Sequence, residues 1–163
     1  MRKAAALMGA AALIFGATNV SAQSKSFAGT WTAVADSAAP APAPGRGGGR
    51  GLGQAATIVQ DDKTLTITRT TQNGEMKSVY NLDGSESKNT LTMGGNAVEQ
   101  TSKTKWEGDK LVITTTMNVG GTPSESTMAL SLDQAGQLIV EATGNGRGGG
   151  PPTTTKMTYK KSS

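Results

Sequence analysis

Cysteine and histidine are both absent from this chain of 163 residues, and aromatic residues make up only 4% of it. Their absence excludes a disulfide framework, a thiol nucleophile, a structural zinc site and every catalytic triad that needs histidine. Catalysis would then depend on carboxylate, lysine, tyrosine or hydroxyl chemistry, and no cluster of such residues stands out. We therefore expect a protein that is not an enzyme and that uses no metal ion and no cofactor.

The acidic residues could in principle form a catalytic pair or a weak calcium site, but they are scattered over the segments between strands. An Asp side chain in a turn binds the backbone nearby, which explains its presence without catalysis. No loop offers enough oxygen ligands for calcium. The residues concerned are Asp61, Asp62, Asp83, Glu107, Asp109 and Asp133.

The N-terminus has the pattern of a secretory signal peptide. Arg2 and Lys3 precede an apolar, alanine-rich run over 4–17, and Val20-Ser21-Ala22 supplies a small-residue cleavage site. The run is shorter than the ~20 residues that span a bilayer, although an uncleaved anchor is the alternative. We expect cleavage of residues 1–22 and an exported protein, periplasmic or secreted, without stable membrane insertion.

The charge of the processed chain gives little reason to expect nucleic acid as a partner. Removal of Arg2 and Lys3 leaves 14 cationic against 12 anionic residues. Gly144–Gly149 matches G-x-G-x-x-G, but the dinucleotide site needs a following helix, and Pro151-Pro152 with a strand pattern follows instead. The Arg-Gly repeats lack interleaved aromatic residues, so we interpret them as surface loops.

Beyond residue 23 the apolar residues recur with period two, which predicts β-strands. Leu65-Thr66-Ile67-Thr68 is one example, and Asn73-Gly74 is a typical two-residue hairpin turn. We expect an all-β fold, an antiparallel up-and-down barrel of about eight to ten strands, in which closure removes the exposed edges. The expected strands are 27–34, 55–60, 63–72, 75–82, 88–93, 96–107, 109–118, 123–132, 137–143 and 153–160.

Two low-complexity stretches interrupt the strand pattern. Residues 37–53 are rich in Ala, Pro and Gly, and 144–152 read GNGRGGGPP. Such compositions form extended or flexible connections. Because both lie between strands, we expect one domain over 23–163 with two loop insertions, and a monomer.

Phe27-Ala28-Gly29-Thr30-Trp31 at the start of the first strand resembles the F-x-G-x-W opening of the calycin group, the lipocalins and intracellular lipid-binding proteins. The resemblance extends in strand order over most of the processed chain, and it implies a barrel closed at one end by Phe27, Gly29 and Trp31. The chain looks most like a bacterial exported lipocalin-like protein.

The chain departs from that pattern where the ligand would be held. Met157 stands where intracellular lipid-binding proteins carry an Arg two residues before the Tyr of the last strand, here Tyr159. Residues 35–54 show no pattern of a helical lid. Lipocalins place a late-strand Arg against the Gly-x-Trp tryptophan, and here only Lys156 and Lys160 are near enough in sequence to replace it.

Strand parity divides the interior into an apolar end and a polar end. Arg69 shares the parity of Leu65 and Ile67, and Gln100 and Thr104 share that of Trp106. A barrel with a packed bottom and a wetter mouth is typical of small-ligand binders, although strand ends that merely fray into water would look the same. The candidate ligand-facing residues are Trp106, Tyr80, Tyr159, Arg69, Gln100 and Thr104.

Two of these candidates could instead have ordinary structural roles. Trp106 could be core, and Arg69 could extend to water or pair with a carboxylate instead of a ligand acid. We expect a non-catalytic, exported binding or carrier protein for a small, partly apolar molecule. The alternative is an envelope structural or interaction protein that uses the barrel as a scaffold and its loops as the partner surface.

Overall fold

The computed structural model describes residues 25–34, 51–71, 74–93, 95–119, 121–144 and 151–162. The expected signal peptide over 1–22, its cleavage site, and most of the two low-complexity stretches lie outside these residues. Within the described ranges there is no helix, and so no helix that could cross a membrane.

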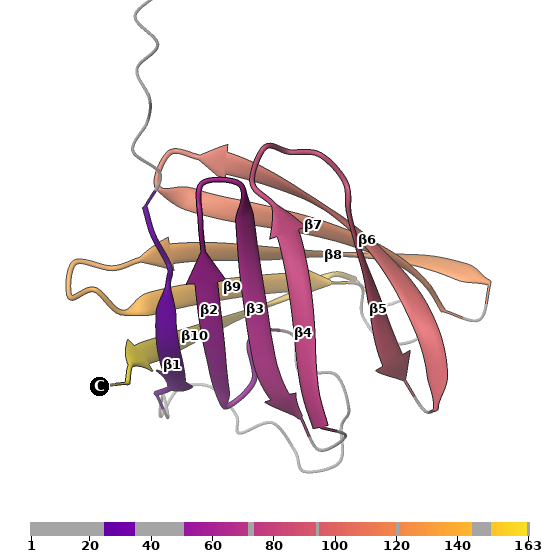
Figure 1. Ribbon diagram of the computed structural model, residues 1–163, viewed down its shortest axis with the longest axis horizontal. Coiled ribbons are helices and arrows are strands. Elements are labelled where there is room, and N and C mark those ends of the chain that lie inside the picture. Colours follow the sequence, from indigo (N-terminus) through magenta and orange to yellow (C-terminus); the bar gives the residue numbers. More distant parts are fainter. Residues whose placement is uncertain are drawn as a thin grey trace, which may run out of the picture.

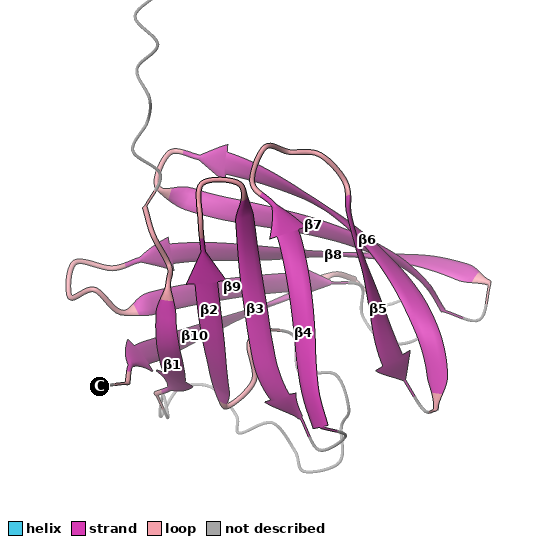
Figure 2. Ribbon diagram, in the orientation of Figure 1, coloured by secondary structure: helices cyan, strands magenta, loops and turns pink. Residues whose placement is uncertain are grey.

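Ten strands form one antiparallel sheet that curls into a nearly closed barrel (Figure 1). Short turns and loops join the consecutive strands from β2 to β9 (Figure 2), and the first strand pairs with the last. Their bounds are β1 Gly29–Ala33, β2 Ala55–Gln60, β3 Thr64–Thr71, β4 Gly74–Asn81, β5 Ser87–Met93, β6 Asn96–Glu107, β7 Lys110–Val119, β8 Thr122–Leu132, β9 Leu138–Gly144 and β10 Thr153–Lys161.

This architecture confirms the all-β, up-and-down barrel expected from the period-two pattern. Each expected strand is present, and each of its ends lies within two residues of the expected position. The spatial order is β4-β3-β2-β1-β10-β9-β8-β7-β6-β5, so the two outermost strands, β4 and β5, are neighbours in sequence. Figure 1 shows these two strands diverging away from the loop that joins them.

Alternation along each strand places the core inside the barrel. The β9 strand is typical, since Leu138, Val140 and Ala142 are buried and the residues between them are half-buried. Most of the apolar core comes from β1–β3 and from the residues of β7–β10 that face them. Its members are Phe27, Trp31, Leu52, Ala56, Ile58, Leu65, Ile67, Tyr80, Leu111, Ile113, Leu130, Leu138, Val140 and Tyr159.

Carboxylates at three turns bind the backbone beside them. Asp61 accepts from the backbone N–H groups of Lys63 and Thr64 at 2.8 and 2.6 Å, and these bonds hold its pKa below the usual value. Asp83 accepts from Ser85 N–H, and Asp133 from the N–H groups of Ala135 and Gln137. These side chains therefore shape the hairpins, as expected for Asp in turns.

Candidate functional site

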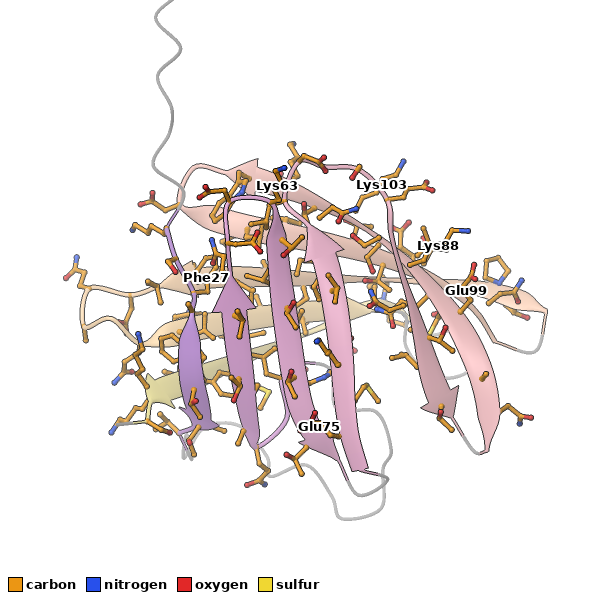
Figure 3. The ribbon with its side chains drawn as sticks, viewed as in Figure 1. Phe27, Lys63, Glu75, Lys88, Glu99 and Lys103 are labelled. Carbon is orange, nitrogen blue, oxygen red and sulfur yellow. The ribbon has the colours of Figure 1, made fainter. Side chains whose placement is uncertain are left out.

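One end of the barrel is closed by aromatic side chains. Trp31 on β1 is 2% exposed, and its Nε1 donates to the Phe27 carbonyl at 2.8 Å. The Phe27 ring stacks on Trp106 of β6 with centroids 5.8 Å apart, and Phe27 N–H donates to Gln60 Oε1. Figure 3 shows Phe27 in the segment that leads into β1. Both tryptophans thus belong to the packed end.

A lysine of the last strand lies over the Trp31 ring. Lys161 pairs with Trp31 in the β1–β10 ladder, and its Nζ lies 5.8 Å from the ring centroid. Gly29 makes room for this side chain, because a Cβ there would lie 2.5 Å from Lys161 Cε, and its φ of 147° also favours glycine. Lys156 and Lys160, which the sequence analysis singled out, are exposed.

Residues 51–53 lie at the end of the first low-complexity stretch, yet Gly51 and Leu52 pack into the barrel. Leu52 is fully buried in the core, and Gly51 is buried too. Leu52 N–H donates to Tyr159 Oη at 3.2 Å, and Tyr159 Oη donates to the Gly53 carbonyl at 3.0 Å. The interpretation of 37–53 as a flexible loop is therefore wrong for its last residues, because composition did not reveal the core contact of one leucine.

The hydrogen bonds of Tyr159 Oη to Leu52 and Gly53, which we call the hydroxyl clamp, predict that the stability of the protein depends on pH. Burial raises the pKa of the Tyr159 hydroxyl to about 12, against opposing effects of the Leu52 N–H bond and the Arg69 charge. The folded-state pKa exceeds the unfolded value near 10. The contribution of the neutral Tyr159 hydroxyl to the free energy of unfolding is therefore complete below pH 10 and is lost as the pH rises towards 12. The loss is on the order of 2 kcal/mol.

Urea unfolding of the wild type and of Tyr159→Phe between pH 8 and 12 checks this expectation. The wild-type midpoint should fall more steeply above pH 10, because the variant has no hydroxyl to ionise at this position. Parallel curves for the two proteins would contradict the prediction.

The inner surface of β4–β7 is polar, unlike the core beside it. Ser78, Ser87, Asn89, Gln100, Ser102, Thr104 and Thr115 are all less than 9% exposed. Burying such groups without partners costs free energy, so most of them should be bonded to protein. Their hydrogen bonds therefore show which of them the fold itself uses.

Several of these groups close the seam between β4 and β5. Val79 N–H donates to Asn89 Oδ1 at 2.8 Å, and Asn89 Nδ2 donates to the Val79 carbonyl at 2.9 Å. Asn81 N–H donates to Ser87 Oγ, and Thr104 Oγ1 donates to the Asn81 carbonyl. The side chains thus satisfy edge backbone groups of β4 that a neighbouring strand would otherwise bind.

Four inward polar groups are left without such partners in the described part of the chain. Arg69 is half-buried and its Nη1 donates to the Gly51 carbonyl, but its buried Nε donates no hydrogen bond. The buried Ser78 Oγ neither donates nor accepts one. Tyr80 and Gln100 are 4% and 5% exposed, and their side chains make no hydrogen bond with the described residues, although their polar atoms are not among the fully buried ones that lack a partner. We call Arg69, Ser78, Tyr80 and Gln100 the free polar set.

The free polar set contains three of the six ligand-facing residues expected from sequence. Thr104 and Tyr159 instead use their hydroxyls on backbone groups, and Trp106 stacks on Phe27. Sequence reasoning missed Ser78, whose parity with Tyr80 on β4 was the available signal. The free polar set therefore lies on β3, β4 and β6.

The charged groups elsewhere offer no second centre within the described residues. The five ion pairs are between lysines and acidic residues, and Figure 3 shows Lys63, Lys88, Glu99 and Lys103 projecting outward from the strands and loops. In the same part of the chain no three acidic residues gather closely enough to hold a metal ion. No family model matches this chain, and no curated protein matches it significantly.

Proposed function

We propose that this protein is an exported, non-catalytic binding or carrier protein that holds a small, partly apolar molecule inside its barrel. The observation that carries the proposal is the free polar set. Arg69 Nε and Ser78 Oγ are buried without a hydrogen-bond partner, and the inward Tyr80 and Gln100 side chains have polar groups that no described residue binds. A few convergent polar groups beside apolar surface are typical of a small-molecule site.

Methionines supply adaptable apolar surface on the same side of the barrel wall. Met76 on β4 and Met117 on β7 are half-buried and share the parity of buried neighbours, Ser78 and Thr115. The thioether side chain is flexible and polarisable, so it adapts to ligands of different shape. This lining suits a molecule with one polar end and an apolar body.

We also propose that the chain is a lipocalin-like member of the calycin group. The support is the barrel topology together with the geometry at its closed end, where Trp31 of the Gly-x-Trp motif is covered by a late-strand cation. Lysine at 161 takes the place that arginine has in the lipocalin pattern. The export proposal rests on the signal-peptide pattern of residues 1–22.

Native mass spectrometry of the protein purified from its own host tests the proposed function. We expect a population whose mass exceeds that of the processed chain by one small molecule, and loss of this population after denaturation and refolding. A single bare mass, with no lipophilic probe bound on titration, would contradict the proposal and favour the scaffold alternative.

A further inference from the structure

The β4 strand is one of the two outermost strands of the sheet, and only the second half of its free edge is covered. There Val79 exchanges hydrogen bonds with the Asn89 side chain, and Asn81 binds the side chains of Ser87 and Thr104. Towards the start of β4 the two outermost strands diverge (Figure 1). The edge of the first half of β4 therefore lies away from β5.

Alternation along β4 identifies the residues whose backbone groups face this open edge. In an antiparallel strand every second residue directs its N–H and C=O to the same side. Val79 and Asn81 direct theirs away from β3, so Glu75 and Lys77 do the same. These backbone groups of Glu75 and Lys77 make no hydrogen bond with the described residues. They are the kind of donors and acceptors that a further strand binds.

The side chains at the same two positions carry opposite charges. Glu75 and Lys77 are exposed, and neither takes part in the five ion pairs found among the described residues. The half-buried Met76 lies between them on the inward face. Opposite charges directly across from each other stabilise a strand pair, and like charges destabilise it. The edge therefore favours a strand that brings a cation to Glu75 and a carboxylate to Lys77.

A second copy of β4 meets these requirements in one register. Residues directly opposite each other in an antiparallel pair either both bond to one another or both do not. The free groups of two copies can thus meet in registers centred on Glu75, Met76 or Lys77. The first and the last place like charges opposite each other. The register centred on Met76 places Glu75 of each copy opposite Lys77 of the other and uses all of the free backbone groups.

We propose that the first half of β4 is a two-fold symmetric contact through which two copies of this chain form a weak dimer. Each Glu75–Lys77 pair exchanges its N–H···O=C bonds across the axis, where the two Met76 side chains meet. Because the strands are antiparallel, the second copy continues past Gly74, away from Val79 and Asn81. The bonds that these two residues make to side chains of β5 and β6 are therefore kept.

This inference goes beyond the proposed ligand binding and does not depend on it. It differs from the monomer expected from the sequence, because that expectation took barrel closure to remove every free edge. The contact is short, so the dimer should be weaker than one with an interface of standard size.

Sedimentation equilibrium of the processed protein, over micromolar to millimolar concentrations, tests the dimer. We expect the average mass to rise with concentration from one chain towards two, and added salt to weaken the rise by screening exposed charges. Lys77→Glu should raise the dissociation constant at least about tenfold, because two opposite-charge pairs become two like-charge pairs. The double variant with Glu75→Lys and Lys77→Glu should restore dimerisation.

Two further variants control for net charge and for the backbone contact. Lys160→Glu makes the same change in charge at an exposed position of β10, and it should leave the dissociation constant unchanged. Lys77→Pro removes an N–H that faces the open edge and no bond to β3, so it should abolish the dimer and leave the barrel folded. Circular dichroism checks the fold of each variant.

The outcomes are distinct from those for ligand binding. A wild type that stays a single chain at every concentration would overturn the dimer. A dimer that survives both Lys77→Glu and Lys77→Pro would overturn its assignment to β4, and a loss that the double variant does not restore would overturn the register centred on Met76. Retention of a ligand in native mass spectrometry is measured separately and is unaffected by any of these results.

Discussion

Replacement of Trp31 by alanine is expected to lower the free energy of unfolding by roughly 3–5 kcal/mol. The side chain is 2% exposed, lies beneath the Lys161 ammonium and donates its Nε1–H to the Phe27 carbonyl. The truncation empties a large volume at the closed end and leaves the Phe27 carbonyl without its donor. Urea unfolding followed by circular dichroism at 218 nm measures the loss independently of tryptophan fluorescence.

Two variants separate the contributions to this loss. Trp31→Phe keeps an aromatic ring but no N–H, so it should cost clearly less than Trp31→Ala. Trp106→Ala should also cost less, because that ring is only partly buried and its stacking on Phe27 is worth about 0.5–1.5 kcal/mol beyond buried area. A loss below about 1 kcal/mol for Trp31→Ala would contradict the role of this residue in closing the barrel.

The fold was predictable because the signals that specify it are local. Alternation in segments such as Leu65-Thr66-Ile67 assigns strands, and turn residues such as Asn73-Gly74 and Asp133 end them. Up-and-down topology then follows, since most of the connections are short enough to join only antiparallel neighbours. The closed end was expected from the resemblance of Phe27–Trp31 to the calycin opening motif, which can be read from sequence because its residues are adjacent.

The site was less predictable because side-chain partners depend on register. Thr104 and Tyr159 face inward as parity implies, but each hydroxyl is used by a backbone group far away in sequence, Asn81 and Gly53. Asn89 is another example of a partner that sequence does not reveal. Its side chain pairs with the Val79 backbone because β4 and β5 are the outermost strands of the sheet. Parity predicts which face a residue occupies, whereas hydrogen-bond partners follow from the three-dimensional arrangement.

Leu52 shows how composition can mislead about a single residue. It stands among glycines and an arginine, so no apolar periodicity marks it, yet it is fully buried. The backbone around it is held by Tyr159, and the adjacent Gly51 carbonyl accepts from Arg69. A Cβ at Gly51 would lie 3.1 Å from Met157 Sδ, so glycine lets the chain pass closely over the last strand.

Leu52→Ala is therefore expected to destabilise the barrel by about 2–5 kcal/mol, the range for a buried leucine in a well-packed core. An ordinary surface loop residue would change the stability by no more than about 0.5 kcal/mol. Urea unfolding monitored by circular dichroism distinguishes the two cases. Val59→Ala is the matched control, because Val59 is 61% exposed on β2 and its truncation should cost less than about 1 kcal/mol.

A double-mutant cycle with Tyr159→Phe shows whether Leu52 and the hydroxyl clamp act together. Tyr159→Phe removes the acceptor of Leu52 N–H and the donor to the Gly53 carbonyl. Once this clamp is lost, the segment has less reason to keep Leu52 in the core, so Leu52→Ala should cost less in the Tyr159→Phe background than in the wild type. Equal costs in both backgrounds would mean that packing alone holds Leu52. A cost no greater than that of Val59→Ala would show that residues 51–53 are a peripheral loop after all.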